Sequence, residues 1–219
     1  MSSYYTLHVA GLTRQLPICY CNDKFDIAAF VMFSDVELTV ACAKELLKKV
    51  PQFDVIVTAE SKGIPLAYEM ARQTGGGMRY IVARKMPKLY MRDPVGVDVR
   101  SITTAAEQKL WLDKNEADYI RGKRVLIADD VISTGESLSA LVKLVDYACG
   151  NIAAKCAVLA EGDAAERKDI IYLEQLPLIY KRPPNLKSTT HADTSAHRIK
   201  KSPSECHPRV ISLKKHWRK

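Results

Sequence analysis

The amino-acid sequence predicts an α/β fold in which helices flank a central, mostly parallel β-sheet. Four short apolar runs have the composition of buried strands: residues 54–59, 79–84, 124–129 and 153–160. A helical pattern follows the first run, with Leu66 and Met70 on one face, and another follows the third run and ends at Gly150. Strands that alternate with helices are joined by right-handed crossovers, so we expect them to pair in parallel.

The first 33 residues come before this alternating pattern. Residues 4–33 predict short strands or a hairpin, with breaks at Pro17 and at a later Asn-Asp pair. Ser34 then predicts a helix start, because a serine followed three residues later by Glu37 can satisfy two exposed backbone N–H groups. This helix should run to about Val50, since a proline comes next.

The segment between the second and third apolar runs differs from the rest. Residues 86–108 contain prolines, a glycine and few bulky apolar side chains, which predicts a long loop or a loose hairpin. Such a length is uncommon in a compact domain unless the segment serves a function.

Composition predicts a cytoplasmic protein that neither crosses nor enters a membrane. The longest uninterrupted apolar run, residues 27–33, is too short to span a bilayer. The first residues lack the charged and apolar regions of a signal peptide. The six cysteines form no CxxC pair and suit free thiols in a reducing compartment.

The formal net charge of +8 is concentrated at one end of the chain. Residues 181–219 hold 11 Lys/Arg and 2 Asp/Glu, which leaves 22 of the 33 basic and 23 of the 25 acidic residues for residues 1–180. The near-neutral body argues against nucleic-acid binding there. The basic tail, which we expect to be disordered, could contact nucleic acid or be a dispensable extension.

Charged or glycine-containing segments follow three of the predicted strands. They lie at residues 59–63, 84–85 and 129–135. Ligands of parallel sheets bind outside the carboxyl ends of the strands, and these ends meet at one edge. We therefore expect the three segments to form one site.

Residues 133–137 read Ser-Thr-Gly-Glu-Ser and lie between a strand and a helix. Backbone N–H groups at a helix start lack partners and the helix dipole is positive there, which favours an anion. Gly135 lets the chain curl round a phosphate, and the hydroxyls of Ser133, Thr134 and Ser137 can add donors.

Asp129 and Asp130 come one turn before this anion-binding sequence. Ionised carboxylates repel a second phosphate but accept well from hydroxyls. The arrangement predicts a sugar that carries a phosphate on one side and vicinal hydroxyls on the other. An ordinary strand-to-helix turn capped by serine and threonine is the alternative.

The segment VLIADDVISTGES, residues 125–137, resembles the signature of type I phosphoribosyltransferases. The resemblance implies the fold of that family: a central, mostly parallel sheet flanked by helices, an N-terminal hood and a mobile loop. It also implies that residues 133–137, including Glu136, bind a 5-phosphate and that Asp129 and Asp130 hold the ribose. The similarity covers about residues 15–180, most of the chain outside the basic tail.

Two further segments resemble the diphosphate-binding parts of the family. TAESKGIPLAYEMA, residues 58–71, is similar to a loop in which Ser61, Lys62 and Gly63 would contact the leaving diphosphate. VARKMPKLYM, residues 82–91, is similar to adenine and xanthine phosphoribosyltransferases, which makes its cations candidates for neutralising phosphates: Arg84, Lys85 and Lys88. A surface turn and a solvated basic face are the alternatives.

The resemblance implies transfer of a 5-phosphoribosyl group from phosphoribosyl diphosphate to a purine base, with adenine ahead of xanthine. Magnesium is expected on the substrate, with Asp129 and Asp130 as candidate ligands. The implied catalytic residues are Asp129, Asp130, Lys62, Arg84 and Glu107. A mobile loop from about residue 90 to 108 would exclude water, and relatives commonly form homodimers.

The base would bind under the hood, where Phe25 or Phe33 could stack on it; both are otherwise core aromatics. Glu107 stands where adenine-specific relatives have a glutamate, but the neighbouring tyrosine and glycine of their motif are absent. We expect three parts: a hood segment (residues 1–34), a core (35–180) and a basic tail (181–219).

Two other functions remain open from the sequence. A regulator could keep the fold and bind phosphoribosyl diphosphate without transferring its sugar, although no helix-turn-helix pattern comes before residue 34. A dinucleotide-binding oxidoreductase would need a glycine fingerprint after the first strand, and the cluster at residues 75–77 follows a helix instead.

Overall fold

A computed structural model describes residues 3–99 and 108–181 of the chain. Its core is a five-stranded sheet with the order β10-β9-β8-β4-β5, in which every neighbouring pair is parallel. The bounds are β4 Val55–Ala59, β5 Arg79–Ala83, β8 Arg124–Ile132, β9 Asn151–Glu161 and β10 Ile171–Leu176. The four predicted strands and their parallel pairing are confirmed, and β10 is added at one edge.

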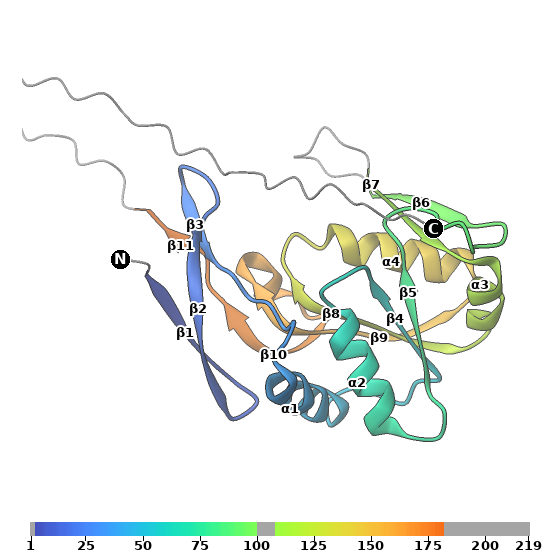
Figure 1. The fold of residues 1–219 in the computed structure, drawn as a ribbon, viewed down its shortest axis with the longest axis horizontal. Coiled ribbons are helices and arrows are strands. Elements are labelled where there is room, and N and C mark those ends of the chain that lie inside the picture. Colours follow the sequence, from blue (N-terminus) through green and yellow to red (C-terminus); the bar gives the residue numbers. More distant parts are fainter. Residues whose placement is uncertain (1–2, 100–107, 182–219) are drawn as a thin grey trace, which may run out of the picture. The chain divides into compact units, whose positions relative to one another are not determined.

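Helices cover both faces of this sheet (Figure 1). On one face α1 (Val36–Leu47) and α2 (Ile64–Thr74) pack through buried residues such as Leu46 and Met70. On the other, α3 (Lys114–Ile120) and α4 (Glu136–Tyr147) contribute Ile120 and Leu141. Strand side chains alternate between the two layers, which is why the central strands carry apolar residues on both faces.

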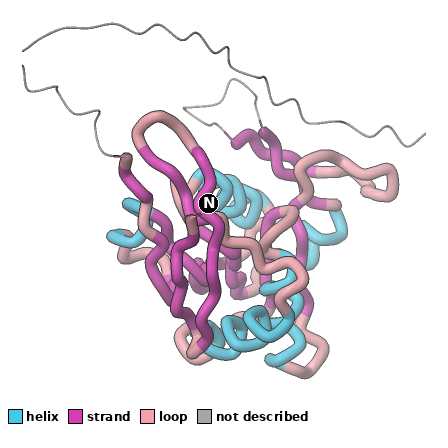
Figure 2. Tube along the Cα trace, turned by 60° about the vertical axis from the view of Figure 1, so that its left-hand side comes forward, coloured by secondary structure: helices cyan, strands magenta, loops and turns pink. Residues whose placement is uncertain are grey.

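A second, antiparallel sheet forms the hood, with the order β1-β2-β3-β11 (Figure 2). Its strands are β1 Tyr4–Val9, β2 Leu12–Tyr20, β3 Phe25–Ala28 and β11 Ile179–Tyr180. Pro17 was expected to break the chain but lies within β2. It can do so because β2 changes partner there, pairing with β1 through Pro17 and with β3 from Ile18 onward.

The chain after the sheet returns to the hood. β11 pairs with β3, and the Lys181 ammonium binds the Asp26 carboxylate at 3.0 Å and the Asn22 carbonyl at 2.8 Å. The hood sheet therefore contains the last described residues as well as the first ones. Side chains of β1 and β2, such as Leu7 and Leu16, share the core layer of α1 and α2.

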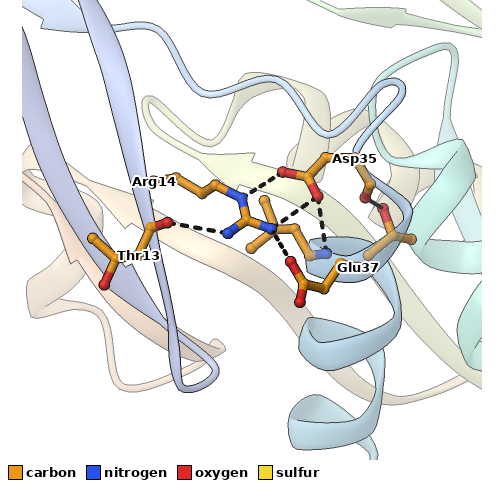
Figure 3. Close-up of polar contacts among 6 residues, drawn as sticks. Thr13, Arg14, Asp35 and Glu37 are labelled. Carbon is orange, nitrogen blue, oxygen red and sulfur yellow. Dashed lines mark hydrogen bonds and ion pairs between the residues drawn. The ribbon is translucent and has the colours of Figure 1, made fainter.

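Arg14 of β2 connects the hood to the start of α1 (Figure 3). Its guanidinium binds Asp35 through Nε at 2.7 Å and Glu37 through Nη2 at 2.7 Å. Hydrogen bonding to Arg14 lowers the pKa of the Asp35 carboxyl, which therefore stays ionised at neutral pH. Because Asp35 caps α1, this contact ties the hood to the core.

Asp35 also corrects the predicted start of α1. The helix is capped by Asp35, whose carboxylate accepts from the Leu38 amide at 3.1 Å, and not by Ser34, which has a left-handed φ of 67°. The capping residue is one position later than predicted, because Arg14 holds the Asp35 carboxylate there. The helix ends at Leu47, before the expected Val50.

The predicted loop or loose hairpin is a hairpin in its described part. β6 (Val95–Val99) pairs with β7 (Gln108–Leu112), and residues 100–107 between them lie outside the described residues. A short 3-10 helix (Gly162–Glu166) follows β9. No helix in the described ranges is both long and apolar enough to cross a membrane.

Candidate functional site

Residues 133–137 leave β8 and turn into α4 (the 133–137 loop). Gly135 has a φ of +80° and directly precedes α4, whose first N–H groups have no helical partner. The side chains of Ser133, Thr134 and Ser137 are exposed. The loop borders a hollow of about 110 Å³ that Asp129 also lines. The expected anion site is therefore open and lies beside a carboxylate.

The two aspartates lie inside β8, which continues to Ile132 and not only to the predicted end at Asp129. β9 pairs with β8 along this extension, whereas β4 pairs with it only as far as Ile127. The sheet is thus open on the β4 side at the level of the aspartates. Gly63, which follows β4, approaches Asp129 on this side.

Asp130 is almost fully buried, with 5% of its surface exposed. Its Oδ2 accepts no hydrogen bond from the described residues and lies 3.7 Å from the Lys62 ammonium. The Asp130 amide donates to Asp129 Oδ1 at 2.9 Å. Burial, together with the Asp130 charge, raises the pKa of the Asp129 carboxyl. A ligand that donates hydrogen bonds or brings positive charge would relieve both carboxylates.

Residues 60–63 connect β4 to α2 (the 60–63 loop), and the Glu60–Ser61 peptide bond is cis. Ser61 and Lys62 are exposed, whereas Gly63 is buried. A Cβ at Gly63 would overlap the Thr58 hydroxyl and lie 2.8 Å from Asp129 Oδ1. Only glycine allows the loop to approach the aspartates this closely.

The basic cluster (Arg84, Lys85 and Lys88) follows β5 and lies beside the 60–63 loop. Arg84 is held by two backbone hydrogen bonds of 2.8 Å with Trp111 of β7. Glu60 Oε1 lies 3.7 Å from both the Arg84 guanidinium and the Lys88 ammonium. The segments that follow β4, β5 and β8 therefore lie together, as the sequence predicted.

Two residues of this region have roles that the sequence did not suggest, Glu60 and Arg167. Glu60 lies within the predicted segment 59–63 but was given no role there. Arg167 follows the 3-10 helix, and its Nη1 would lie 2.6 Å from a Cβ at Gly135. Asp169 holds this guanidinium through two hydrogen bonds of 2.8 and 2.9 Å. No local sequence pattern indicates that Arg167 reaches the 133–137 loop.

Comparison with known proteins identifies the family. Residues 39–179 match the model of the phosphoribosyl transferase domain, which is more than half of the chain. The chain belongs to the phosphoribosyltransferase family. The aspartate pair, the 133–137 loop and the 60–63 loop all lie within the matched residues.

Curated relatives with the same percentage of sequence identity to this chain are named for different purine bases. A hypoxanthine/guanine phosphoribosyltransferase of Methanococcus voltae is 34% identical over 52% of this chain and 56% of its own length. An adenine phosphoribosyltransferase of Cenarchaeum symbiosum is 34% identical over 51% and 62%. A xanthine phosphoribosyltransferase of Bacillus thuringiensis is 34% identical over 60% and 67%. The chain thus spans little more than half of the first of these relatives.

Solved structures confirm the type I phosphoribosyltransferase fold. Adenine phosphoribosyltransferase from Rhodothermus marinus superposes with a TM-score of 0.55 at 20% identity, over 80% of this chain and 94% of its own. The enzyme from Leishmania donovani also gives 0.55, at 18% identity, over 80% and 76%. At these identities the likeness concerns the fold alone.

The two predicted base-stacking residues are not brought together with the aspartates. Phe25 contacts Tyr180 edge-on within the hood, with ring centroids 6.0 Å apart. Phe33 is 47% exposed and lines a separate pocket of about 220 Å³ with Tyr68 of α2, so it is not a core residue. Glu107 lies outside the described residues.

Proposed function

We propose that this phosphoribosyltransferase is a pentosyltransferase of purine salvage that uses phosphoribosyl diphosphate as its donor. The observation that carries the proposal is the open hollow between Asp129 and the start of α4. The 5-phosphate would accept hydrogen bonds from the N–H groups and hydroxyls of the 133–137 loop. The ribose hydroxyls would donate to Asp129 and Asp130, whose carboxylates accept few other hydrogen bonds.

The leaving diphosphate would lie over the 60–63 loop and the basic cluster. Negative charge grows on the diphosphate as its bond to the ribose breaks. Lys62, Arg84, Lys85 and Lys88 would stabilise this charge, together with the backbone of residues 61–63. Positioning of donor and base and electrostatic stabilisation of the leaving group would supply most of the catalysis.

Magnesium is proposed as the counterion of the donor, held mainly through water and substrate oxygens. The residues fit such a role, because Asp130 Oδ2 accepts no hydrogen bond from the described residues and Asp129 is its direct neighbour. In residues 3–99 and 108–181, no three His, Cys, Asp or Glu side chains are grouped to hold a metal ion. Asp129 and Asp130 would be the candidate side-chain ligands.

Adenine is proposed as the preferred base and xanthine as the next. The base would lie under the hood, where Arg14 of β2 binds residues at the start of α1. Phe25 and Phe33 remain proposed stacking residues, and Phe33 is the more exposed of the two. Glu107 remains a proposed proton-transfer group. The adenine, xanthine and hypoxanthine/guanine relatives are equally identical to this chain, so the base has to be determined by assay.

We further propose a cytoplasmic homodimer. Large apolar side chains are exposed along α1 and α2, including Val36 and Tyr68 at 73% and 53%. A second copy of the chain would cover such a surface. Contact of the basic tail with nucleic acid also stays a proposal, because residues 182–219 lie outside the described part.

A panel of bases tests the proposed function. We expect the protein with phosphoribosyl diphosphate and Mg²⁺ to release diphosphate when adenine is added, and more slowly with xanthine. Hypoxanthine, guanine and uracil serve as the comparison. Diphosphate release is measured by a coupled assay. Binding of the donor without release for any base would contradict the proposal and indicate an effector-binding regulator.

A further inference from the structure

Glu60 is held in one position at the end of β4. Its amide donates to the Ala83 carbonyl at 2.9 Å, which continues the pairing of β4 with β5. Its carboxylate accepts from the Lys85 amide at 3.0 Å. The backbone bond places Glu60 beside the end of β5, and the carboxylate bond directs its side chain toward the basic cluster.

The carboxylate lies between two cations but is not tightly bound to either. Oε1 is 3.7 Å from the Arg84 guanidinium and 3.7 Å from the Lys88 ammonium. Charge-assisted hydrogen bonds are nearer 2.7–2.9 Å, so these cations attract Glu60 without a short bond to it. The pKa of Glu60 is lowered, first by the Lys85 hydrogen bond and then by the neighbouring cations. The group is therefore a carboxylate at neutral pH.

The position of Glu60 creates a competition that the proposed reaction has to resolve. With no diphosphate bound, the carboxylate reduces the repulsion between Arg84 and Lys88 and keeps both beside the 60–63 loop. A diphosphate that binds these cations brings several negative charges close to Glu60. Like charges at such distances oppose each other even when water screens them.

We propose that Glu60 is an internal counter-anion that competes with diphosphate for Arg84 and Lys88 and so promotes its release. This inference rests on the proposed function, since it concerns the diphosphate end of the same site. Glu60 acts through the two cations and is a positioning residue, not a catalytic one. Its effect should appear in diphosphate affinity and leave binding at the 133–137 loop unchanged.

The test is the affinity of inorganic diphosphate, measured by calorimetry with Mg²⁺ at low salt. Glu60→Gln keeps the side-chain shape and an acceptor for the Lys85 amide but removes the charge. We expect it to bind diphosphate roughly three- to tenfold more tightly than the wild type. Ribose 5-phosphate affinity should change by less than about twofold, since its site lies at the other end. In turnover, diphosphate should become a stronger product inhibitor.

Glu45→Gln is the matched control. It removes the same charge from α1, where Glu45 pairs with Lys48, and should leave diphosphate affinity unchanged. Should Glu60→Gln not fold, Glu60→Ala removes the same charge and frees the Lys85 amide for a diphosphate oxygen, so tighter binding is again expected.

Three results of the binding measurements would contradict the inference. Unchanged or weaker diphosphate binding in the Glu60 variants, with normal binding by the wild type, overturns the inference alone. A wild type that binds ribose 5-phosphate but no diphosphate overturns both the inference and the proposed diphosphate site. Equal tightening by Glu45→Gln would show an effect of net charge and also overturn the inference.

Discussion

Asp130→Asn should lower kcat/KM without destabilising the protein. The Asp130 carboxylate is proposed to accept from a ribose hydroxyl and to attract hydrated magnesium. Loss of a hydrogen bond to a charged group costs about 1.5–3 kcal/mol, which corresponds to roughly a ten- to hundredfold loss in rate. Steady-state kinetics with varied phosphoribosyl diphosphate measure this loss.

The unfolding free energy of Asp130→Asn should stay equal or increase. The wild-type carboxylate is buried beside Asp129, and Lys62, the cation paired with it among the described residues, is 3.7 Å away and half exposed. Burial of a poorly paired charge is unfavourable, so its removal relieves a cost in the folded state. Asp118→Asn, on the exposed side of α3, is the control for both readouts. Unchanged kinetics, or a clear drop in the thermal midpoint, would contradict the assignment of Asp130.

Gly135→Ala should abolish most of the binding of the 5-phosphate. The residue has a φ of +80°, a conformation that costs an alanine about 1–2 kcal/mol. Its Cβ would also lie 2.6 Å from Arg167 Nη1, so either the guanidinium or the 133–137 loop has to move. A displaced loop no longer directs its N–H groups at the phosphate. We expect ribose 5-phosphate affinity to fall at least about tenfold, as measured by calorimetry.

Gly122→Ala separates the backbone effect from the effect on the site. Gly122 has a φ of +73°, and a Cβ there would meet no atom within 4 Å. Both variants should therefore lose similar backbone stability, and only Gly135→Ala should lose phosphate affinity. A loss of ribose 5-phosphate binding in both would assign the effect to general destabilisation.

The sequence predicted most of the core because its strands and helices have local signals. The four predicted strands each contain a short apolar run, and α2 and α4 show a clear helical period. The segments of the site were also predictable, since the carboxyl ends of parallel strands meet at one edge. The sequence alone therefore assigns Asp129, Lys62 and Arg84 to one region.

The features that were missed depend on contacts between distant parts of the chain. Asp35 caps α1 because Arg14, 21 residues earlier, holds its carboxylate. Arg167 lies beside Gly135 only because β9 and the 3-10 helix place it there. Glu60 faces Arg84 and Lys88 through the pairing of β4 with β5. Such long-range contacts cannot be inferred from the hydrophobic pattern of a strand, which repeats every two residues, or of a helix, which repeats every 3.6.

The central claim is that the 133–137 loop binds a 5-phosphate while Asp129 and Asp130 bind the sugar that carries it. A crystal structure with ribose 5-phosphate and Mg²⁺ tests this claim most directly. The account predicts the phosphate in the hollow at Gly135, within hydrogen-bond distance of the first amides of α4, and the ribose hydroxyls on the two carboxylates. A phosphate bound at the basic cluster, with no ligand in that hollow, would contradict it.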